Sequence, residues 1–265
     1  MLAGVYEAKK KNGTVYYRSS IHFMGTHVSL GSFDTERDAH KCYKEADKLY
    51  HTPSITLDNY SRKIRFLPMD KAVTILNHRD NRIYIKTPIY LRTGYFSYFM
   101  KDGRELKFDN DDLFYYSSHR ILMRQGHLYV NDYGMQYSIL SRFGIKSFAV
   151  AGKDYTFANG DPTDFRYQNV IVVNKYHGVT RIEKNGRISY QAKIHLNGDF
   201  LIGRYSTDSK AAVAYNKAVD YARDHGLVKD FIMNYVVEYS PKEYAETYTS
   251  VHLPKKYMDY IDSLM

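Results

Sequence analysis

The chain contains no tryptophan and only one cysteine, Cys42, among its 265 residues. A single cysteine excludes an internal disulfide and a cysteine-rich zinc site, so the sequence predicts a cytoplasmic protein. No apolar run is long enough to cross a bilayer, and residues 1–11 contain no apolar signal-peptide core before their lysines. The chain also lacks a Gly-rich phosphate-binding loop and a Gly-x-Ser-x-Gly motif. The sequence therefore predicts no membrane contact and no common nucleotide-binding or hydrolase site.

Acidic residues are the minority among the charged ones. The 38 Lys and Arg residues exceed the 29 Asp and Glu residues, which gives a formal net charge of +9. Such a balance attracts polyanions over a long range, although charge alone does not separate nucleic acid from an acidic protein. The 28 tyrosines suit the half-buried surfaces of strands, and 44% of the residues are apolar, enough for one to three domains with buried cores.

Two segments of the chain, residues 4–46 and 177–219, share one pattern. With one-residue gaps the alignment matches Gly4 with Gly178, Asn12-Gly13 with Asn185-Gly186, Ile21-His22 with Ile194-His195, Gly31 with Gly203, Thr35 with Thr207 and Tyr43 with Tyr215. A repeated module on a basic chain indicates a protein that binds an extended, repetitive, acidic partner, and DNA is the obvious candidate.

Each copy predicts three antiparallel strands followed by one helix. Residues 15–23 alternate in the manner of a strand, and Asn12-Gly13 is typical of a tight hairpin because both turn positions need positive φ. A second turn at Met24-Gly25 leads to a third strand, which we expect to end at Gly31. Thr35 or its neighbour Asp34 then caps a helix with an apolar face. The helix would cover one face of the sheet and leave the other face open.

The pattern Leu30-Gly31-Ser32-Phe33-Asp34-Thr35, with Ala39 to Ala46 on the helix, resembles the DNA-binding domain of the plant ethylene-response-factor (APETALA-type) family and its bacterial and phage relatives. The second copy carries the same pattern at residues 202–215. This resemblance implies that the open face of each sheet reads the major groove of double-stranded DNA. The expected DNA-binding residues are Tyr6, Lys10, Tyr16, Arg18, Ser20, His22, His27 and Ser29 in the first copy and Thr180, Arg181, Lys184, Arg187, Gln191, Lys193 and His195 in the second. The alternative interpretation is an ordinary solvated sheet surface.

Residues 53–93 are predicted to be a linker with a strand or two and a helix near residues 70–77. Arg62, Lys63 and Arg65 would be free to follow DNA phosphates there. The tail, residues 229–265, predicts a helical extension interrupted at Pro241 and Pro254, which packs on the preceding module or mediates self-association.

The middle of the chain, residues 94–175, predicts short strands and carries a second resemblance. The segment Asn159 to Val170, NGDPTDFRYQNV, resembles the core of phage HNH homing endonucleases, a family whose chains also contain ethylene-response-factor-type domains. The resemblance implies a ββα-like domain with a histidine base, an asparagine that orients it and a divalent metal. The chain keeps Asn169, but Thr156-Phe157 occupies the Asp-His position and Ser141 stands where the family usually has histidine.

We therefore expect this HNH-like domain to be catalytically dead, with no catalytic residue, metal or cofactor. The stretch between Asn174 and Gly178 is too short for the helix that bears the second metal ligand in the family. Arg142 and Arg166 are expected to bind the DNA backbone instead. An active nicking endonuclease with an atypical site is the alternative. Its candidate ligands would be Asp154, Asp161, Asp164, His119 and His127.

The predicted architecture is α+β, with two small modules of a three-stranded antiparallel sheet and a helix flanking a degenerate HNH domain. The domain boundaries are 1–52, 53–93, 94–175, 176–228 and 229–265. The predicted function is sequence-specific binding of double-stranded DNA by a phage or mobile-element transcriptional regulator in the bacterial cytoplasm, with RNA polymerase as a further partner. A protein-interaction module that inhibits a host or phage factor is a second alternative. The sequence specifies neither an oligomeric state nor a target site.

Overall fold

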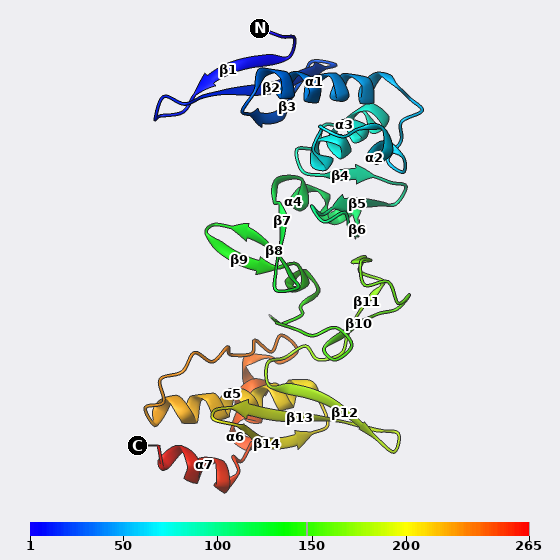
Figure 1. Cartoon of the computed structure of the whole chain (residues 1–265). Helices are drawn as coiled ribbons and strands as arrows, with labels where there is room; N and C mark the ends of the chain where they lie inside the picture. Colours follow the sequence, from blue (N-terminus) through cyan, green and yellow to red (C-terminus); the bar gives the residue numbers. More distant parts are fainter. Residues whose placement is uncertain (147, 265) are drawn as a thin grey trace. The chain divides into compact units, whose positions relative to one another are not determined.

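The structure, a computed structural model, describes residues 1–146 and 148–264 (Figure 1). It has the predicted mixed α+β architecture, with several small antiparallel sheets and helices packed on them. The chain forms two units, Met1–Tyr137 with Asp161–Asn169, and Ser138–Gly160 with Val170–Met265. Residues 94–175, which the sequence predicts as one domain, thus contribute to both units.

The first module lies in the first unit. Its strands β1 (Val5–Lys9), β2 (Val15–Phe23) and β3 (Thr26–Phe33) form an antiparallel sheet in that order, and helix α1 (Glu36–His51) follows. The Thr35 hydroxyl accepts the Asp38 N–H at 3.1 Å and caps the helix as predicted. The core between sheet and helix contains Ile21, Phe23, Val28, Leu30, Cys42, Ala46 and Leu49.

The second module, in the second unit, repeats this arrangement. Strands β12 (Val179–Lys184), β13 (Arg187–His195) and β14 (Asp199–Tyr205) precede helix α5 (Asp208–Asp224), which Thr207 caps. Its core contains Val179, Ala192, Ile194, Ile202, Ala211, Ala214, Tyr215 and Ala218. The two modules predicted from the repeat are therefore confirmed as folded units of sheet and helix.

Each sheet contains a bulge at the same place in its third strand. Ser19 and Ser20 are neighbours in β2, but their partners in β3 are Gly31 and Ser29, so Leu30 is an extra residue. The second sheet shifts its register in the same way, with Ile202 as the extra residue. The third strand of the first module also runs on to Phe33, beyond the predicted end at Gly31. A bulge lets the strand bend and still continue its ladder beyond that glycine.

Residues 53–93 form a packed layer, which differs from the predicted linker. Helices α2 (Tyr60–Lys63) and α3 (Met69–Asn81) precede β4 (Ile89–Leu91). Apolar side chains of this segment join the core of the first module, namely Ile55, Ile64, Leu67, Ala72, Ile75 and Leu76. The predicted helix near residues 70–77 is α3. Burial of these side chains ties the segment to α1 and stabilises it by the hydrophobic effect.

Polar contacts add to this attachment. The Glu45 carboxylate on α1 accepts the backbone N–H groups of Arg65, Phe66 and Leu67 at 3.0, 2.6 and 2.8 Å. Arg79 on α3 donates to three carbonyls at and beyond the end of α1, those of Leu49, Thr52 and Ile55. The bond to Leu49 gives a partner to a carbonyl of the last helical turn, which the helix itself leaves without one.

The rest of the first unit is built around aromatic side chains. Strands β4, β5 (Tyr95–Phe99) and β6 (Glu105–Asp109) form one sheet, followed by the 3-10 turn η1 (Asn110–Asp112) and α4 (Leu113–Ser118). Strands β7 (Ile121–Arg124), β8 (His127–Asp132) and β9 (Met135–Ser138) form a second sheet. Residues 161–169 return to β6, where the Phe165 N–H donates to the Lys107 carbonyl at 2.8 Å. The Phe165 ring stacks on Phe108, with centroids 5.7 Å apart.

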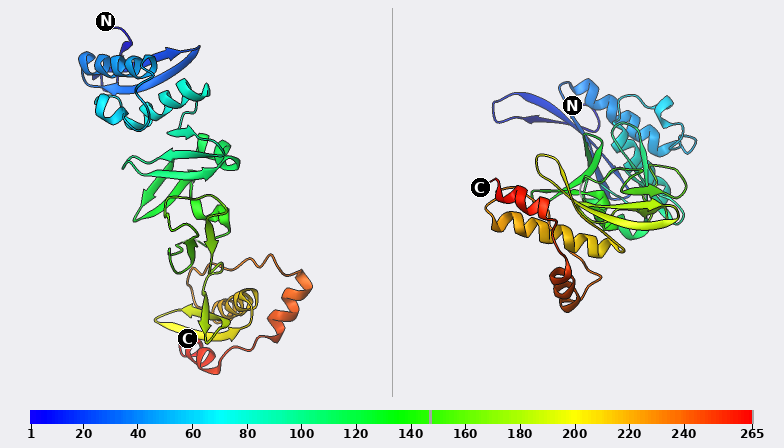
Figure 2. Two further views of the ribbon diagram at one scale, coloured as in Figure 1. Left: turned by 90° about the vertical axis from the view of Figure 1, so that its right-hand side faces the viewer. Right: turned by 90° about the horizontal axis from the view of Figure 1, so that it is seen from below.

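The second unit begins with η2 (Ile139–Phe143) and the two-stranded sheet of β10 (Tyr155–Phe157) and β11 (Val170–Val172). Residues 173–178, all of which the structure describes, contain no helix. Helices α6 (Pro241–Ser250) and α7 (Lys255–Asp262) with their connecting segments wrap around the second module (Figure 2). The extension adds Val236, Val251, Tyr257 and Ile261 to the core of that module. The prediction that the tail packs on the preceding module is confirmed.

Candidate nucleic-acid interface

The face of the first sheet opposite α1 is exposed and polar. Tyr6, Arg18 and Ser32 form a row across its three strands, because they are cross-strand partners. Nearer the β2–β3 turn, His22 lies opposite His27. We define open face 1 as Tyr6, Tyr16, Arg18, Ser20, His22, His27, Ser29 and Ser32. Ser20 is the only buried residue of open face 1, with 7% of its surface exposed.

A tyrosine orients the only arginine of open face 1. The Nε and Nη2 groups of Arg18 donate to the Tyr16 hydroxyl at 3.2 and 2.8 Å, and the guanidinium lies 5.5 Å from the centroid of the same ring. The side chain therefore lies along the sheet in one arrangement. Restricting a long side chain in this way lowers the entropy that it loses on binding.

The second sheet presents an equivalent face. Thr180, Gln191 and Arg204 form a row across its strands, at the positions that Tyr6, Arg18 and Ser32 occupy in the first sheet. We define open face 2 as Thr180, Ile182, Ser189, Gln191, Lys193, His195, Asp199, Leu201 and Arg204. The structure thus brings Thr180, Gln191, Lys193 and His195 together as predicted. In the first sheet the basic side chain of the row is Arg18, on the second strand. In the second sheet it is Arg204, on the third strand.

Arg204 lies on open face 2, although the sequence did not predict it as a candidate residue. Ile202 is buried, so strict alternation along β14 would direct Arg204 into the core as well. The bulge at Ile202 interrupts this alternation. Gly203 therefore faces the helix, and Arg204 lies on the open face of the sheet. The signal in the sequence was the Ile-Gly pair, which recurs as Leu30-Gly31.

Arg181 lies on the other side of the same sheet. Its cross-strand partner is Tyr190, whose ring packs against the core, and its Nη2 pairs with the Glu183 carboxylate at 2.9 Å. The structure therefore does not bring Arg181 together with Gln191. Lys184 and Arg187 are exposed partners at the tip of the β12–β13 hairpin, and Lys10 is exposed in the corresponding turn of the first module.

Open face 1 and open face 2 differ in charge near the turn between the second and third strands of each sheet. In open face 2, Nδ1 of His195 lies 2.8 Å from Oδ1 of Asp199, and this hydrogen bond lowers the pKa of the Asp199 carboxyl. In open face 1 the same place holds His22 and His27, with ring centroids 4.8 Å apart. One module therefore offers an imidazole with a carboxylate, and the other offers two imidazoles.

Arg166, predicted to bind the DNA backbone, is held by an ion pair within the first unit. Both oxygens of the buried Asp164 carboxylate accept its Nε and Nη2 at 2.8 and 2.6 Å, and the guanidinium lies 5.2 Å from the Tyr95 ring centroid. The hydrogen bond to Asp164 raises the pKa of Arg166. Arg142 lies in η2 of the second unit and is half-buried. The two arginines belong to different units, so the structure assigns them to no common patch.

The residues that stand at the HNH positions have structural roles. Asn169 is buried, and its amide donates to the Asp164 carbonyl at 2.8 Å. Thr156 and Phe157 lie on β10. Within residues 1–146 and 148–264, no three His, Cys, Asp or Glu side chains are close enough together to hold a metal ion.

The candidate carboxylates of the middle segment are used in turns and ion pairs. Asp161 accepts from the Thr163 hydroxyl at 2.6 Å and from Lys107 at 2.9 Å, and these bonds lower its pKa to about 2. Burial acts to raise the pKa of Asp154, but the Val150 N–H and the Lys146 ammonium outweigh it and the pKa is lowered. Neither carboxyl is suited to carry a proton near neutral pH.

Cys42 is not a nucleophile. It is fully buried on α1, and burial, together with the nearby Glu45 carboxylate, raises the pKa of its thiol to about 12. A thiol attacks only as the thiolate, which is therefore almost absent at neutral pH.

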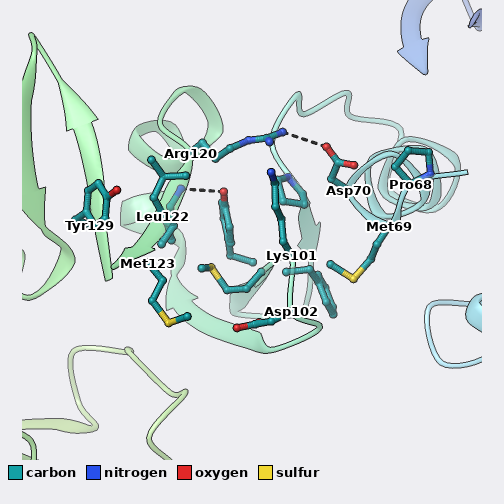
Figure 3. Close-up of a pocket in the computed structure, with 14 residues that line it drawn as sticks. Pro68, Met69, Asp70, Lys101, Asp102, Arg120, Leu122, Met123 and Tyr129 are labelled. Carbon is teal, nitrogen blue, oxygen red and sulfur yellow. Dashed lines mark hydrogen bonds and ion pairs between the residues drawn. The ribbon is translucent and has the colours of Figure 1, made fainter. Parts of the chain in front are cut away.

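The first unit also contains a groove of about 680 Å³ between the start of α3, strand β5 and strand β7 (Figure 3). Arg120 and Asp70 face each other across it and pair at 3.0 Å. Its charged lining consists of two cations, Lys101 and Arg120, and two carboxylates, Asp70 and Asp102. Because these charges balance, the groove is not suited to a polyanion.

Comparison of the chain with protein-family models, with curated proteins and with solved structures finds no match in any of the three. In the part of the chain that the structure describes, no helix has the length and apolar character needed to cross a membrane.

Proposed function

We propose that this chain binds double-stranded DNA with the two open sheet faces, each lying in the major groove. The observation that carries the proposal is the repetition of one surface in two modules, with a row of hydrogen-bonding side chains across the three strands of each. The net charge of +9 supports a polyanionic partner.

The size of the sheets supports this binding mode. Three strands spaced about 4.8 Å apart span roughly 10 Å between their outer axes, and the major groove is about 12 Å wide. The side chains are of the right kind as well. Arginine pairs with guanine and glutamine with adenine, so Arg18, Gln191 and Arg204 are the residues that we expect to select bases.

The further proposal is that the protein regulates transcription and descends from a phage or mobile-element HNH endonuclease that no longer cuts. Thr156 and Phe157 supply neither a metal-binding carboxylate nor an imidazole base, and Asn169 is committed to the Asp164 carbonyl. A protein that occupies a site without cutting it blocks RNA polymerase or recruits it in the bacterial cytoplasm.

The test is selection of bound sequences from a random duplex library, followed by affinity measurements on single variants. Gln191→Ala and Arg204→Ala should each cost about 1–3 kcal/mol and relax the preference at a few base pairs. Arg18→Ala should do the same in another part of the site. Arg181→Ala is the matched control, because it removes an arginine from the opposite face of the same sheet.

Three results would count against the proposal. The first is that no duplex is bound in a salt-dependent manner. The second is that Arg181→Ala changes base preference as much as Arg204→Ala does. The third concerns catalysis: magnesium- or manganese-dependent nicking that is lost on substitution of Asn169, Asp154 or Asp161 would favour an active endonuclease.

A further inference from the structure

The hairpin between β2 and β3 places two histidines side by side. Its turn consists of Met24 and Gly25, both with positive φ, at 46° and 77°. In a two-residue hairpin the residues that flank the turn form a hydrogen-bonded pair, and the next pair is not hydrogen-bonded. His22 and His27 are that next pair. Side chains approach each other most closely at non-hydrogen-bonded positions, where the Cα atoms are about 4.5 Å apart.

Both imidazoles are exposed, with ring centroids 4.8 Å apart and planes inclined by 57°. Neither ring takes part in a side-chain hydrogen bond or an ion pair with any other described residue. The nitrogen atoms are therefore available for a ligand. Because the side chains lie at the surface, rotation about χ2 can turn either ring nitrogen toward a common point.

We propose that His22 and His27 form a two-histidine chelate site for a divalent transition-metal ion such as Zn²⁺, Ni²⁺ or Cu²⁺. Imidazole nitrogens bind these ions at about 2.0–2.1 Å. With an angle of about 90–109° between the two nitrogens at the ion, the ring centroids lie roughly 4.5–5.2 Å apart. The observed separation falls within this range, so a metal ion fits with little movement of the backbone.

The chemistry of the site defines its selectivity. Two neutral nitrogen ligands suit ions of borderline softness, whereas Mg²⁺ and Ca²⁺ prefer oxygen ligands. Water completes the coordination on the exposed side. A bound ion would also add positive charge to open face 1, at the place where open face 2 holds the His195–Asp199 pair.

The second module supplies a matched control. His195 lies at the position equivalent to His22, but its cross-strand partner is Asp199, and the two side chains bind each other at 2.8 Å. A metal ion at His195 would have to break the contact between His195 and Asp199, and only one imidazole would be present to bind it. Substitution of His195 should therefore leave the proposed chelate unchanged.

The experiment titrates the full-length, DNA-free protein with Ni²⁺ and, separately, with Zn²⁺ by calorimetry in a non-chelating buffer. The wild-type protein should show one site that His22→Gln and His27→Gln each weaken by roughly 100-fold, because the second ligand of a chelate binds at a high effective concentration. His195→Gln should bind as the wild type does. The double variant should be little weaker than either single variant, since one substitution already destroys the chelate.

Electron paramagnetic resonance of the Cu²⁺ complex gives an independent readout at one equivalent of metal. The wild-type protein and His195→Gln should show coupling to two imidazole nitrogens, and the His22 and His27 variants should not. The inference is overturned if all three single variants bind the metal as the wild type does, or if Mg²⁺ competes with Zn²⁺ at equal concentration. No DNA is present, so either result leaves the proposed function to be judged by its own test.

Discussion

The ring of Tyr43 occupies the space into which any side chain at position 4 would project. A Cβ atom built on Gly4 would lie 2.0 Å from Cδ2 of Tyr43, and Gly4 has φ of +72°. The second module repeats the contact between Gly178 and Tyr215, with a distance of 2.2 Å and φ of +69°. In both modules a tyrosine of the helix thus holds the chain where it enters the first strand.

The first prediction follows from this contact. Gly4→Ala should destabilise the first unit by roughly 2–5 kcal/mol, because the left-handed backbone and the overlap with Tyr43 both oppose the added methyl group. Gly13→Ala is the control. Gly13 has φ of +83° but nothing within 4 Å of the added Cβ, so only the backbone cost of roughly 1–2 kcal/mol should remain. Urea unfolding of each variant measures the difference, and equal losses would show that the tyrosine ring moves aside.

The second prediction concerns Glu45, which joins α1 to the segment before α3. Glu45→Gln should lower the free energy of unfolding by about 2 kcal/mol, because the carboxylate accepts three backbone N–H groups and an amide oxygen accepts them more weakly. Protection of the Arg65, Phe66 and Leu67 amides from hydrogen exchange should fall at the same time. Glu7→Gln, which changes an exposed residue of β1, should alter neither quantity.

The third prediction separates folding from DNA binding at Arg166. Arg166→Ala should destabilise the first unit by about 3 kcal/mol, because it leaves the buried Asp164 carboxylate without this cation. Arg166→Lys should be intermediate, since an ammonium lacks the planar pair of N–H donors that matches both carboxylate oxygens. Thermal unfolding measures the stabilities. If Arg166→Ala leaves stability intact but weakens DNA binding and lowers its salt slope, Arg166 is a phosphate contact and not mainly a structural residue.

The fourth prediction is a pH dependence at Asp161. Its pKa in the folded protein is lowered from 3.8 to about 2, so its bonds to Thr163 and Lys107 stabilise the fold above pH 3.8, and this contribution is lost as the pH falls toward 2. Asp161→Asn should lower stability at pH 6 and flatten the decline between pH 3.8 and 2. A decline that keeps its full slope in the variant would assign the acid sensitivity to other carboxylates.

The elements that the sequence predicted well are those with local signals. Met24-Gly25 and Asn185-Gly186 form two-residue turns with positive φ at both positions, and Thr35 and Thr207 cap helices with their own hydroxyls. The first hairpin differs from the prediction, because only Gly13 of Asn12-Gly13 has positive φ and the connection is longer, with the Gly13 N–H donating to the Lys10 carbonyl at 2.9 Å. These interactions involve residues a few positions apart. They can be recognised from the chain alone, and the repeat made each of them visible twice.

The features that the sequence did not predict depend on how strands and helices pack against one another. The linker prediction for residues 53–93 was wrong about packing because Ile75 and Leu76 are buried against α1, which a periodicity analysis of the segment cannot show. Arg204 was overlooked because a bulge, not the composition, determines which face of the sheet it lies on. Arg166 and Asp164 are only two residues apart, but the burial of Asp164 could not be predicted, because it lies in the segment that pairs with Lys107 of β6.

The path of residues 138–169 has a practical consequence for dissecting the protein. The chain leaves the first unit after Tyr137, returns to it for residues 161–169 and leaves it again before Val170. No single cut between two residues can therefore yield both units intact. A fragment that ends at Tyr137 lacks the Phe165 ring that stacks on Phe108, and a fragment that begins at Val170 lacks β10, the partner of β11. Limited proteolysis at one peptide bond between 138 and 169 should leave two pieces that stay associated until they are denatured.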